Sequence, residues 1–239
     1  MTNVLFLYAH PEPTSFCAAM ISEALKVLEN AGHDVKISDL YAKGFNPVGG
    51  RLDFKEQADP NRFHYQTEQA HAARTGSFAD DIATEQELVL WADVFVPVFP
   101  LWWGNPPAIL KGWYDRVLAY GFGYVDGARF DTGLFRGRRA MLAISTGGTP
   151  ARFTDEGPYG PIDKVLWSSH HLILGYMGFA CEEPFVAYAA PRVSQEERDI
   201  YKRDFAQKIL SMAEKPVDRN LREENPLARV GENAWAAVR

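Results

Sequence analysis

Residues 94–107 constrain the fold of this chain most strongly, because an apolar run passes into an aromatic loop and then into two prolines. Residues 94–99 have the near-continuous apolar character of a parallel strand that is covered on both faces. The prolines at 106–107 suit the first turn of a helix, where a missing N–H costs nothing. We therefore predict a buried strand, a loop and a helix over residues 108–118.

The loop carries two adjacent tryptophans, Trp102 and Trp103, directly after the strand. Open α/β sheets bind their ligands at the carboxyl ends of parallel strands, so we expect a flat aromatic ligand here. Adjacent residues of an extended segment point in opposite directions. We expect at most one tryptophan to face the ligand and the other to pack inward. The simpler alternative is that both belong to the core.

Other apolar runs alternate with helical patterns along the chain. The sequence predicts strands over 4–9, 33–40, 138–145 and 179–188, and helices over 16–30, 84–91, 162–176 and 195–213. Capping signals mark three helix starts, at Ser15, at Thr84 with Glu87, and at Ser194 with Glu197. Five strands that alternate with helices indicate an α/β fold: one doubly wound parallel sheet with helices on both faces and the flavodoxin-like strand order 2-1-3-4-5.

Two segments fall outside this alternation. Residues 41–83 are polar and mixed, with scattered aromatics, and we predict no regular structure in them. An excursion of about 40 residues is unusual in a compact domain and tends to be functional, so a dimerisation arm that packs on a second subunit is favoured over a plain surface loop. Residues 214–239 form a polar tail to which we assign no role. Residues 1–213 are then one domain with the arm inserted into it.

The composition excludes several classes of protein. Of the 239 residues, 46% are hydrophobic and 23% charged, which is typical of a globular protein with a sizeable core. The net charge of −6 gives no reason to expect a nucleic-acid partner. The chain has no apolar run of about 20 residues and no signal peptide, so we expect a cytoplasmic protein. His170 and His171 would diverge on a helix, and we predict no metal site.

Three loops should converge on one crevice, because the first, third and fourth strands are neighbours in the order 2-1-3-4-5. The first loop lacks a dinucleotide fingerprint but offers His10, the hydroxyls of Thr14 and Ser15, and the N–H groups of a helix start. These donors suit a phosphate or pyrophosphate, and plain helix capping is the alternative. In the loop over 146–148, N–H groups of the glycines can stabilise an anion that develops on a bound ring, or the loop is simply a tight turn.

These residues together resemble the NAD(P)H:quinone oxidoreductases of the DT-diaphorase type. The resemblance runs from residue 3 to about residue 212 and is carried by His10…Thr14-Ser15-Phe16, Asp39-Leu40-Tyr41, Phe45-Asn46-Pro47, Phe99-Pro100-Leu101…Trp103, the PAILKGW run over 107–113, and Thr146-Gly147-Gly148. It implies a flavodoxin-like fold and a homodimer with tightly bound FAD, in preference to FMN, across the subunit interface. The arm would reach the flavin of the partner.

The resemblance also assigns roles to individual residues. The cofactor would be held by His10, Thr14, Ser15 and Phe16 at its pyrophosphate, by Pro100, Leu101, Trp102, Trp103, Thr146, Gly147 and Gly148 around its isoalloxazine, and by Arg198 near the adenosine end. The substrate pocket would be formed by Trp103, Gly104, Tyr124, Asp126, Phe153 and Tyr159.

The implied reaction is ping-pong. NADH or NADPH lies over the flavin, gives a hydride to its N5 atom and leaves, and a quinone then takes the same place and accepts the hydride. The missing dinucleotide fingerprint agrees with this scheme, because a shared site needs no separate nucleotide-binding domain. Hydride transfer to N5 collects negative charge near N1 and O2 of the ring, so hydrogen-bond donors there lower the barrier.

This chain departs from the family at the residues credited with that charge relay. The mammalian-type enzymes have a tyrosine and a histidine where Phe153 and Tyr159 stand here. Phenylalanine has no proton to give, and a tyrosine with an ordinary pKa of about 10 cannot supply a positive charge. We therefore expect the N–H groups of Gly147 and Gly148 to stabilise the reduced ring, with the Tyr159 hydroxyl assisting.

The second departure is in the substrate pocket, where the family has two tyrosines. Tyr124 matches the first, and Asp126 replaces the second and either changes which acceptors enter or forms an exposed pair with Arg129. Two other functions are compatible with the same residues. One is reduction of azo or nitro compounds by the same chemistry, and the other is service as a flavin-binding ancillary subunit of a potassium-efflux antiporter, with a membrane protein as partner.

Overall fold

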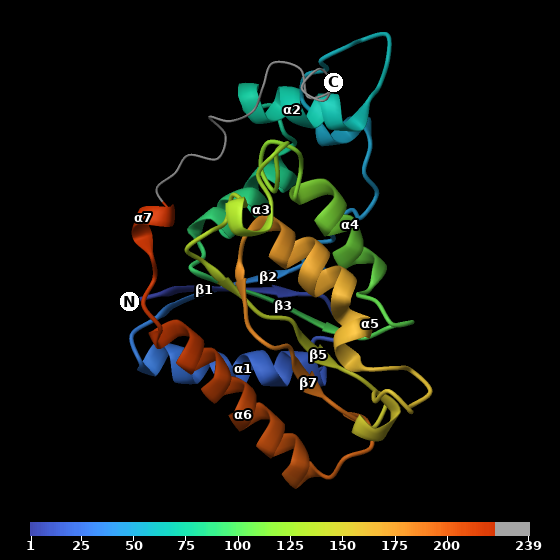
Figure 1. Cartoon of the computed structure of the whole chain (residues 1–239), viewed down its shortest axis with the longest axis vertical. Helices are drawn as coiled ribbons and strands as arrows, with labels where there is room; N and C mark the ends of the chain where they lie inside the picture. Colours follow the sequence, from blue (N-terminus) through green and yellow to red (C-terminus); the bar gives the residue numbers. More distant parts are fainter. Residues whose placement is uncertain (223–239) are drawn as a thin grey trace.

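A parallel sheet lies between two layers of helices in the computed structural model, which describes residues 1–222 (Figure 1). The strands are β1 (Asn3–Tyr8), β2 (Asp34–Asp39), β3 (Val94–Pro100), β4 (Arg139–Ala140), β5 (Ala143–Ser145), β6 (Ala180–Cys181) and β7 (Phe185–Ala187). Every named pair is parallel, with β2 beside β1, β1 beside β3, β3 beside β4 and β5, and these beside β6 and β7. The predicted order of five strand positions is confirmed.

The fourth and fifth positions each hold two short strands, which the sequence analysis did not predict. In β3, the Phe95 carbonyl accepts from the Met141 N–H, so the polar groups of Pro97, two residues on, face the same neighbour. Proline has no N–H to donate to that ladder, and the pairing is interrupted until Val98 meets Ala143. Pro184 lies in the matching gap between β6 and β7.

Helices cover both faces of the sheet. Helices α1 (Phe16–Asn30) and α6 (Gln195–Glu214) pack on one face, while α3 (Asp80–Trp91), α4 (Ala108–Val117) and α5 (Ile162–Ser169) cover the other (Figure 1). The π-helical segment η4 (His170–Gly175) continues α5. None of the helices among residues 1–222 is long and apolar enough to cross a membrane.

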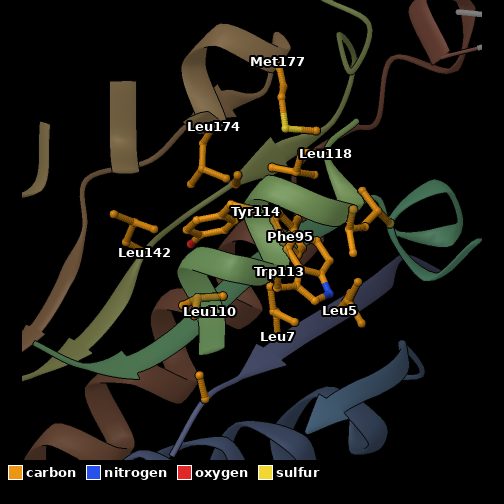
Figure 2. Packing of buried hydrophobic residues seen from close by; sticks show 14 of the residues in the cluster. Leu5, Leu7, Phe95, Leu110, Trp113, Tyr114, Leu118, Leu142, Leu174 and Met177 are labelled. Atoms are coloured by element: carbon orange, nitrogen blue, oxygen red, sulfur yellow. The ribbon is translucent and has the colours of Figure 1, made fainter. Parts of the chain in front are cut away.

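Strand β3 supplies side chains to both halves of the core. Its residues Phe95 and Phe99 point to the α4 side, and the valines between them point to the side of α1 and α6. Trp113 of α4 stacks on Phe95, with ring centroids 5.9 Å apart, and Figure 2 shows Leu5 and Leu7 of β1 beside this pair. Because α4 is fixed on the sheet in this way, the loop between β3 and α4 is held at the carboxyl end of the sheet.

The prediction that residues 41–83 lack regular structure is wrong. They contain a 3-10 turn, η1 (Arg51–Asp53), the helix α2 (Tyr65–Thr75) and the first turn of α3. Helix α2 buries polar side chains, including Glu68, whose carboxylate accepts the Ala58 N–H at 2.7 Å. A helix that faces the protein with polar residues has no apolar periodicity from which it can be predicted.

Two of the three predicted caps are confirmed and one is wrong. The hydroxyls of Ser15 and Ser194 accept N–H groups of α1 and α6. Helix α3 begins four residues before Thr84, after an Ala79 N-cap without a side-chain bond. Its first turn instead carries Asp80 and Asp81, which suit the positive end of the helix dipole.

A largely buried ion cluster ties the segment 41–83 to helix α4. The Arg116 guanidinium of α4 pairs with Asp53 at 2.9 Å and with Asp81 at 2.7 Å. The Tyr65 hydroxyl donates to the same Asp53 carboxylate. At the end of the described chain, α7 (Arg219–Arg222) lies beyond α6, and Arg222 pairs with Asp93. The rest of the predicted tail, 223–239, falls outside the described residues.

Candidate functional site

The loops that follow β1, β3 and β5 form two adjoining hollows at the carboxyl end of the sheet. The smaller, of about 360 Å³, is lined by His10, Ser15, Phe16, Pro100, Leu101, Trp102, Ser145, Thr146, Gly147, Ala190, Pro191 and Arg198. The larger, of about 720 Å³, is lined by Leu101, Trp103, Gly104, Thr146, Gly147, Gly148, Thr149, Arg152, Phe153, Tyr159, Val165 and Arg192. Leu101, Thr146 and Gly147 border both, so the hollows are neighbouring parts of one site.

His10 presents a fixed N–H donor to the smaller hollow. Its Nδ1 accepts the backbone N–H of Glu12 at 3.0 Å, so the neutral ring carries its proton on Nε2. Burial lowers the pKa of His10 below its ordinary value of 6.5, which favours that neutral form. The centroids of the His10 and Trp102 rings are 6.2 Å apart.

The start of α1 supplies further donors. The Ser15 hydroxyl is engaged by the Ala18 N–H at 3.1 Å and by the Tyr8 hydroxyl at 2.6 Å. The backbone N–H of Phe16 makes no hydrogen bond to another backbone group within residues 1–222. The first turn of α1 contains no acidic residue, so the positive end of the helix can act on an anion in the hollow.

Thr14 is not among the residues that line the hollow. Its side chain is exposed, and its hydroxyl donates to the Glu12 carboxylate at 2.6 Å. The donor that the sequence analysis assigned to a phosphate is therefore engaged within the loop itself.

Arg198 contributes a cation from α6. Its guanidinium donates to the Pro191 carbonyl through one terminal nitrogen at 3.4 Å. Its Nε is buried and has no hydrogen-bond partner among the described residues. Because Arg198 also lines the hollow, its positive charge can act on an anionic ligand bound there. Together with His10 and the start of α1, it makes a donor set that fits the phosphates of a flavin nucleotide.

The aromatic loop is a tight turn, and both of its tryptophans are exposed. Trp102 and Asn105 bond each other through N–H and carbonyl groups, and the residues between them, Trp103 and Gly104, have φ of +51° and +72°. Trp102 is 42% exposed and Trp103 fully so. The expectation that one tryptophan packs inward is wrong, because alternation holds on extended backbone and not on a turn of this type.

The glycine loop offers one free N–H. The Gly148 N–H donates to the Thr146 hydroxyl at 3.2 Å, whereas the Gly147 N–H makes no hydrogen bond within the described chain. A Cβ added at Gly148 would lie 2.6 Å from the Phe153 ring, so the backbone here passes directly against an aromatic wall. In this structure the expected pair of donors is reduced to Gly147.

Phe153 and Tyr159 form that wall in different ways. Phe153 is buried, with its ring centroid 5.2 Å from Tyr159 and 5.7 Å from Tyr188. Tyr159 is half exposed, and its hydroxyl accepts a hydrogen bond from Arg152 at 3.0 Å.

Two arginines at this end were missed by the sequence analysis. Besides Arg152, the hollow is lined by Arg192, which donates to the Gly147 carbonyl. Arg152 lies six residues after Thr146, so its closeness to the glycine loop was visible in the sequence. Nothing local marks Arg192, which reaches the loop from the segment before α6.

Tyr124 and Asp126 do not line the two hollows. Tyr124 borders a separate hollow of about 910 Å³ between α2, α4 and η4, which is lined by Gly49, Phe63, His64, Tyr65, Gln66, Gln69, Lys111, Tyr114, Asp115, Leu118, Gly123, Tyr124, Leu172, Ile173, Tyr176 and Met177. Asp126 is exposed and accepts from the Tyr120 hydroxyl at 3.3 Å, and it forms no ion pair with Arg129. A single chain therefore does not bring the predicted substrate residues together.

Known proteins share this fold and much of this sequence. A family model described as a flavodoxin-like fold matches residues 2–209. The chain is 40% identical to ribosyldihydronicotinamide dehydrogenase (quinone) of Pongo abelii, over 82% of this chain and 85% of that protein. It is 39% identical to NAD(P)H dehydrogenase (quinone) 1 of Cavia porcellus, over 79% of this chain and 69% of that protein.

A solved structure agrees with these relatives. A protein from Klebsiella pneumoniae that is described as a candidate quinone reductase superposes with a TM-score of 0.86 at 34% identity, covering 91% of this chain and 87% of that one. The match to the family model spans both helix layers and the three loops of the site. This chain belongs to the flavodoxin-like family of NAD(P)H:quinone oxidoreductases.

Proposed function

We propose that this protein is a flavin-dependent NAD(P)H dehydrogenase that reduces quinones by two electrons in a ping-pong reaction. The observation that carries the proposal is the junction of the two hollows. The smaller one, which we call the phosphate end, gathers unpartnered N–H donors and a cation. The larger one, the ring end, opens beside an exposed aromatic turn and a glycine loop. One elongated ligand with a phosphate and a flat ring fits both parts.

At the phosphate end, His10 Nε2, the start of α1 and Arg198 hold the cofactor. We propose FAD in preference to FMN, because Arg198 lies on a different helix from the other donors and provides for a second phosphate. Thr14 can join only if its hydroxyl leaves Glu12.

At the ring end, the flavin supplies the redox chemistry when bound, as acceptor of a hydride from NADH or NADPH and donor of a hydride to the quinone. Pro100 to Trp103 position the ring from one side, and Thr146 to Gly148 from the other. The free N–H of Gly147 and the hydroxyl of Tyr159 donate hydrogen bonds that stabilise the negative charge of the reduced ring. Trp103, Gly104 and Phe153 border the space that nicotinamide and quinone occupy in turn.

We further propose that the working form is a homodimer in the cytoplasm. The third hollow is lined by Phe63, by Tyr65 of α2, by Tyr124 and by Leu172, and Leu172 is 44% exposed. A monomer seldom leaves large apolar side chains grouped in this way. A second copy seated on this face would cover them, and it would explain why Tyr124 and Asp126 lie apart from the ring end of their own chain.

Purified protein tests the proposal directly. We expect a yellow protein that releases FAD on denaturation, elutes as a dimer, and oxidises NADH or NADPH when a benzoquinone is present. Initial rates at several fixed quinone concentrations should give the parallel reciprocal plots of a ping-pong reaction. A colourless protein that stays inactive after addition of FAD would refute the proposal that this protein is a flavoenzyme. A coloured protein that reduces azo dyes but no quinone would replace the substrate class.

A further inference from the structure

Arg152 and Tyr159 are held together at the ring end by two contacts. The guanidinium donates to the Tyr159 hydroxyl at 3.0 Å, and its central carbon lies 5.7 Å from the centre of the Tyr159 ring. The Tyr159 backbone N–H donates to the Arg152 carbonyl, also at 3.0 Å. The charge of Arg152 is therefore placed at the tyrosine by both backbone and side chain.

The Tyr159 side chain borders the space beside the glycine loop. A Cβ at Gly148 would lie 3.4 Å from the Tyr159 ring. The Phe153 ring also packs against the Tyr159 ring, with the two centroids 5.2 Å apart. These contacts keep the tyrosine in the same hollow as Gly147 and Trp103. Since its oxygen accepts from Arg152, its own proton remains available to a group in that hollow.

A guanidinium changes what such a hydroxyl can do. Arginine stays protonated in proteins, so its hydrogen bond to the phenol oxygen is ionic at every working pH. Hydrogen bonds in a chain polarise one another, and the O–H of a phenol that accepts from a cation becomes a stronger donor. The pair can then act on an anion more strongly than an isolated tyrosine, which carries no charge.

We propose that Arg152 is a positioning residue that acts through the Tyr159 hydroxyl to stabilise the negative charge of the two-electron-reduced flavin. The inference rests on the proposed function and deepens it. A hydride from NAD(P)H brings two electrons and one proton, leaving NAD(P)⁺ and one negative charge on the ring. Transfer of the hydride to the quinone, with one proton from water, gives the hydroquinone and restores the neutral ring. Arg152 thus supplies the cation that Phe153 and Tyr159 lack.

The test is the two-electron reduction potential of the bound flavin, measured by equilibration with a reference dye in the purified holoprotein. In Arg152→Met, we expect the binding preference for reduced over oxidised flavin to fall about tenfold, which equals a shift of about 30 mV to more negative potential. Tyr159→Phe should shift the potential in the same direction, and Arg152→Lys should recover part of the loss. The double variant should shift no further than Tyr159→Phe, because Arg152 acts through the hydroxyl.

Lys164→Met is the matched control. Lys164 is exposed, neighbours Val165 of the ring end and, among the described residues, pairs with the exposed Asp155. The Lys164→Met variant therefore removes one nearby positive charge without touching Tyr159. Its potential should match the wild type. An Arg152→Met potential equal to that of the wild type or of the control would overturn the inference while leaving quinone reduction intact. Additive shifts in the double variant would overturn the action through Tyr159. A protein that binds no flavin would refute the inference together with the proposed function.

Discussion

At the phosphate end the donors are the start of α1, His10 and Arg198. At the ring end they are carried by a glycine loop, by Arg152 just after it and by Arg192 from a distant segment. Part of the first set is backbone that any helix start exposes, and the Ser15 cap fixes the geometry of that part. The second depends on side chains such as Arg152 and Arg192. The difference teaches that binding and reactivity can be altered separately in this molecule.

Arg198→Met should give the largest effect, and it should be confined to binding. Losing an ionic donor worth about 1.5 to 3 kcal/mol weakens the affinity for FAD about 10- to 150-fold. Titration of flavin-stripped protein with FAD, followed by fluorescence, measures it. Arg203→Met removes an exposed cation of the same helix and should leave the affinity unchanged. If the reduction potential moved as much as the affinity, the two ends would not be separable.

Gly148→Ala should act at the ring end. The new Cβ would lie 2.6 Å from the buried Phe153 ring, an overlap that costs about 1 to 3 kcal/mol to relieve. We expect kcat/KM for the quinone to fall about tenfold or more while FAD stays bound. Gly147→Ala is the internal comparison, because its Cβ meets only the flexible end of Arg192 at 3.3 Å. Equal losses in both variants would contradict a role for the Phe153 wall.

The sequence predicted the phosphate end better than the ring end, and the reason is physical. Ser15, Phe16 and the donors of α1 follow from a strand, a loop and a cap, all of them local in sequence. The parallel sheet was equally accessible, since it follows from strands that alternate with helices, and the order of its five positions came from the likeness to flavodoxin-like folds. The division of the outer strands was not predicted, although Pro97, which has no N–H to donate, stands where the pairing of β3 is interrupted.

The parts that escaped prediction depend on contacts between distant residues. Helix α2 buries Glu68 against backbone N–H groups, so its pattern is polar. Arg192 comes to the glycine loop from about 45 residues away in the sequence. The turn that exposes Trp103 breaks the expected alternation because Trp103 adopts a positive φ that bulky residues rarely take.

Trp103→Asn should change stability and activity in opposite directions, with a smaller effect than Gly148→Ala. Asparagine tolerates the positive φ of this position, and asparagine before glycine is the favoured pair for such a turn. We expect the flavin-free protein to gain about 1 kcal/mol in free energy of unfolding, measured in urea, because strain is removed. Quinone turnover should fall, since the aromatic side chain beside the ring end is lost. A variant that gained stability and kept full turnover would show that Trp103 has no part in the site.

His10→Gln tests the phosphate end through pH, with the smallest expected effect. Because burial lowers the pKa of His10 below 6.5, the folded protein binds fewer protons than the unfolded chain. The stabilisation from His10 is thus present above pH 6.5 and is lost as the pH falls through the lowered value. We therefore expect the melting temperature of flavin-stripped wild type to fall more between pH 7.5 and 5 than that of flavin-stripped His10→Gln. With FAD bound the trend should reverse, since a phosphate beside the ring favours the imidazolium. If the melting temperature depended on pH in the same way with and without FAD, His10 would lie away from the phosphate.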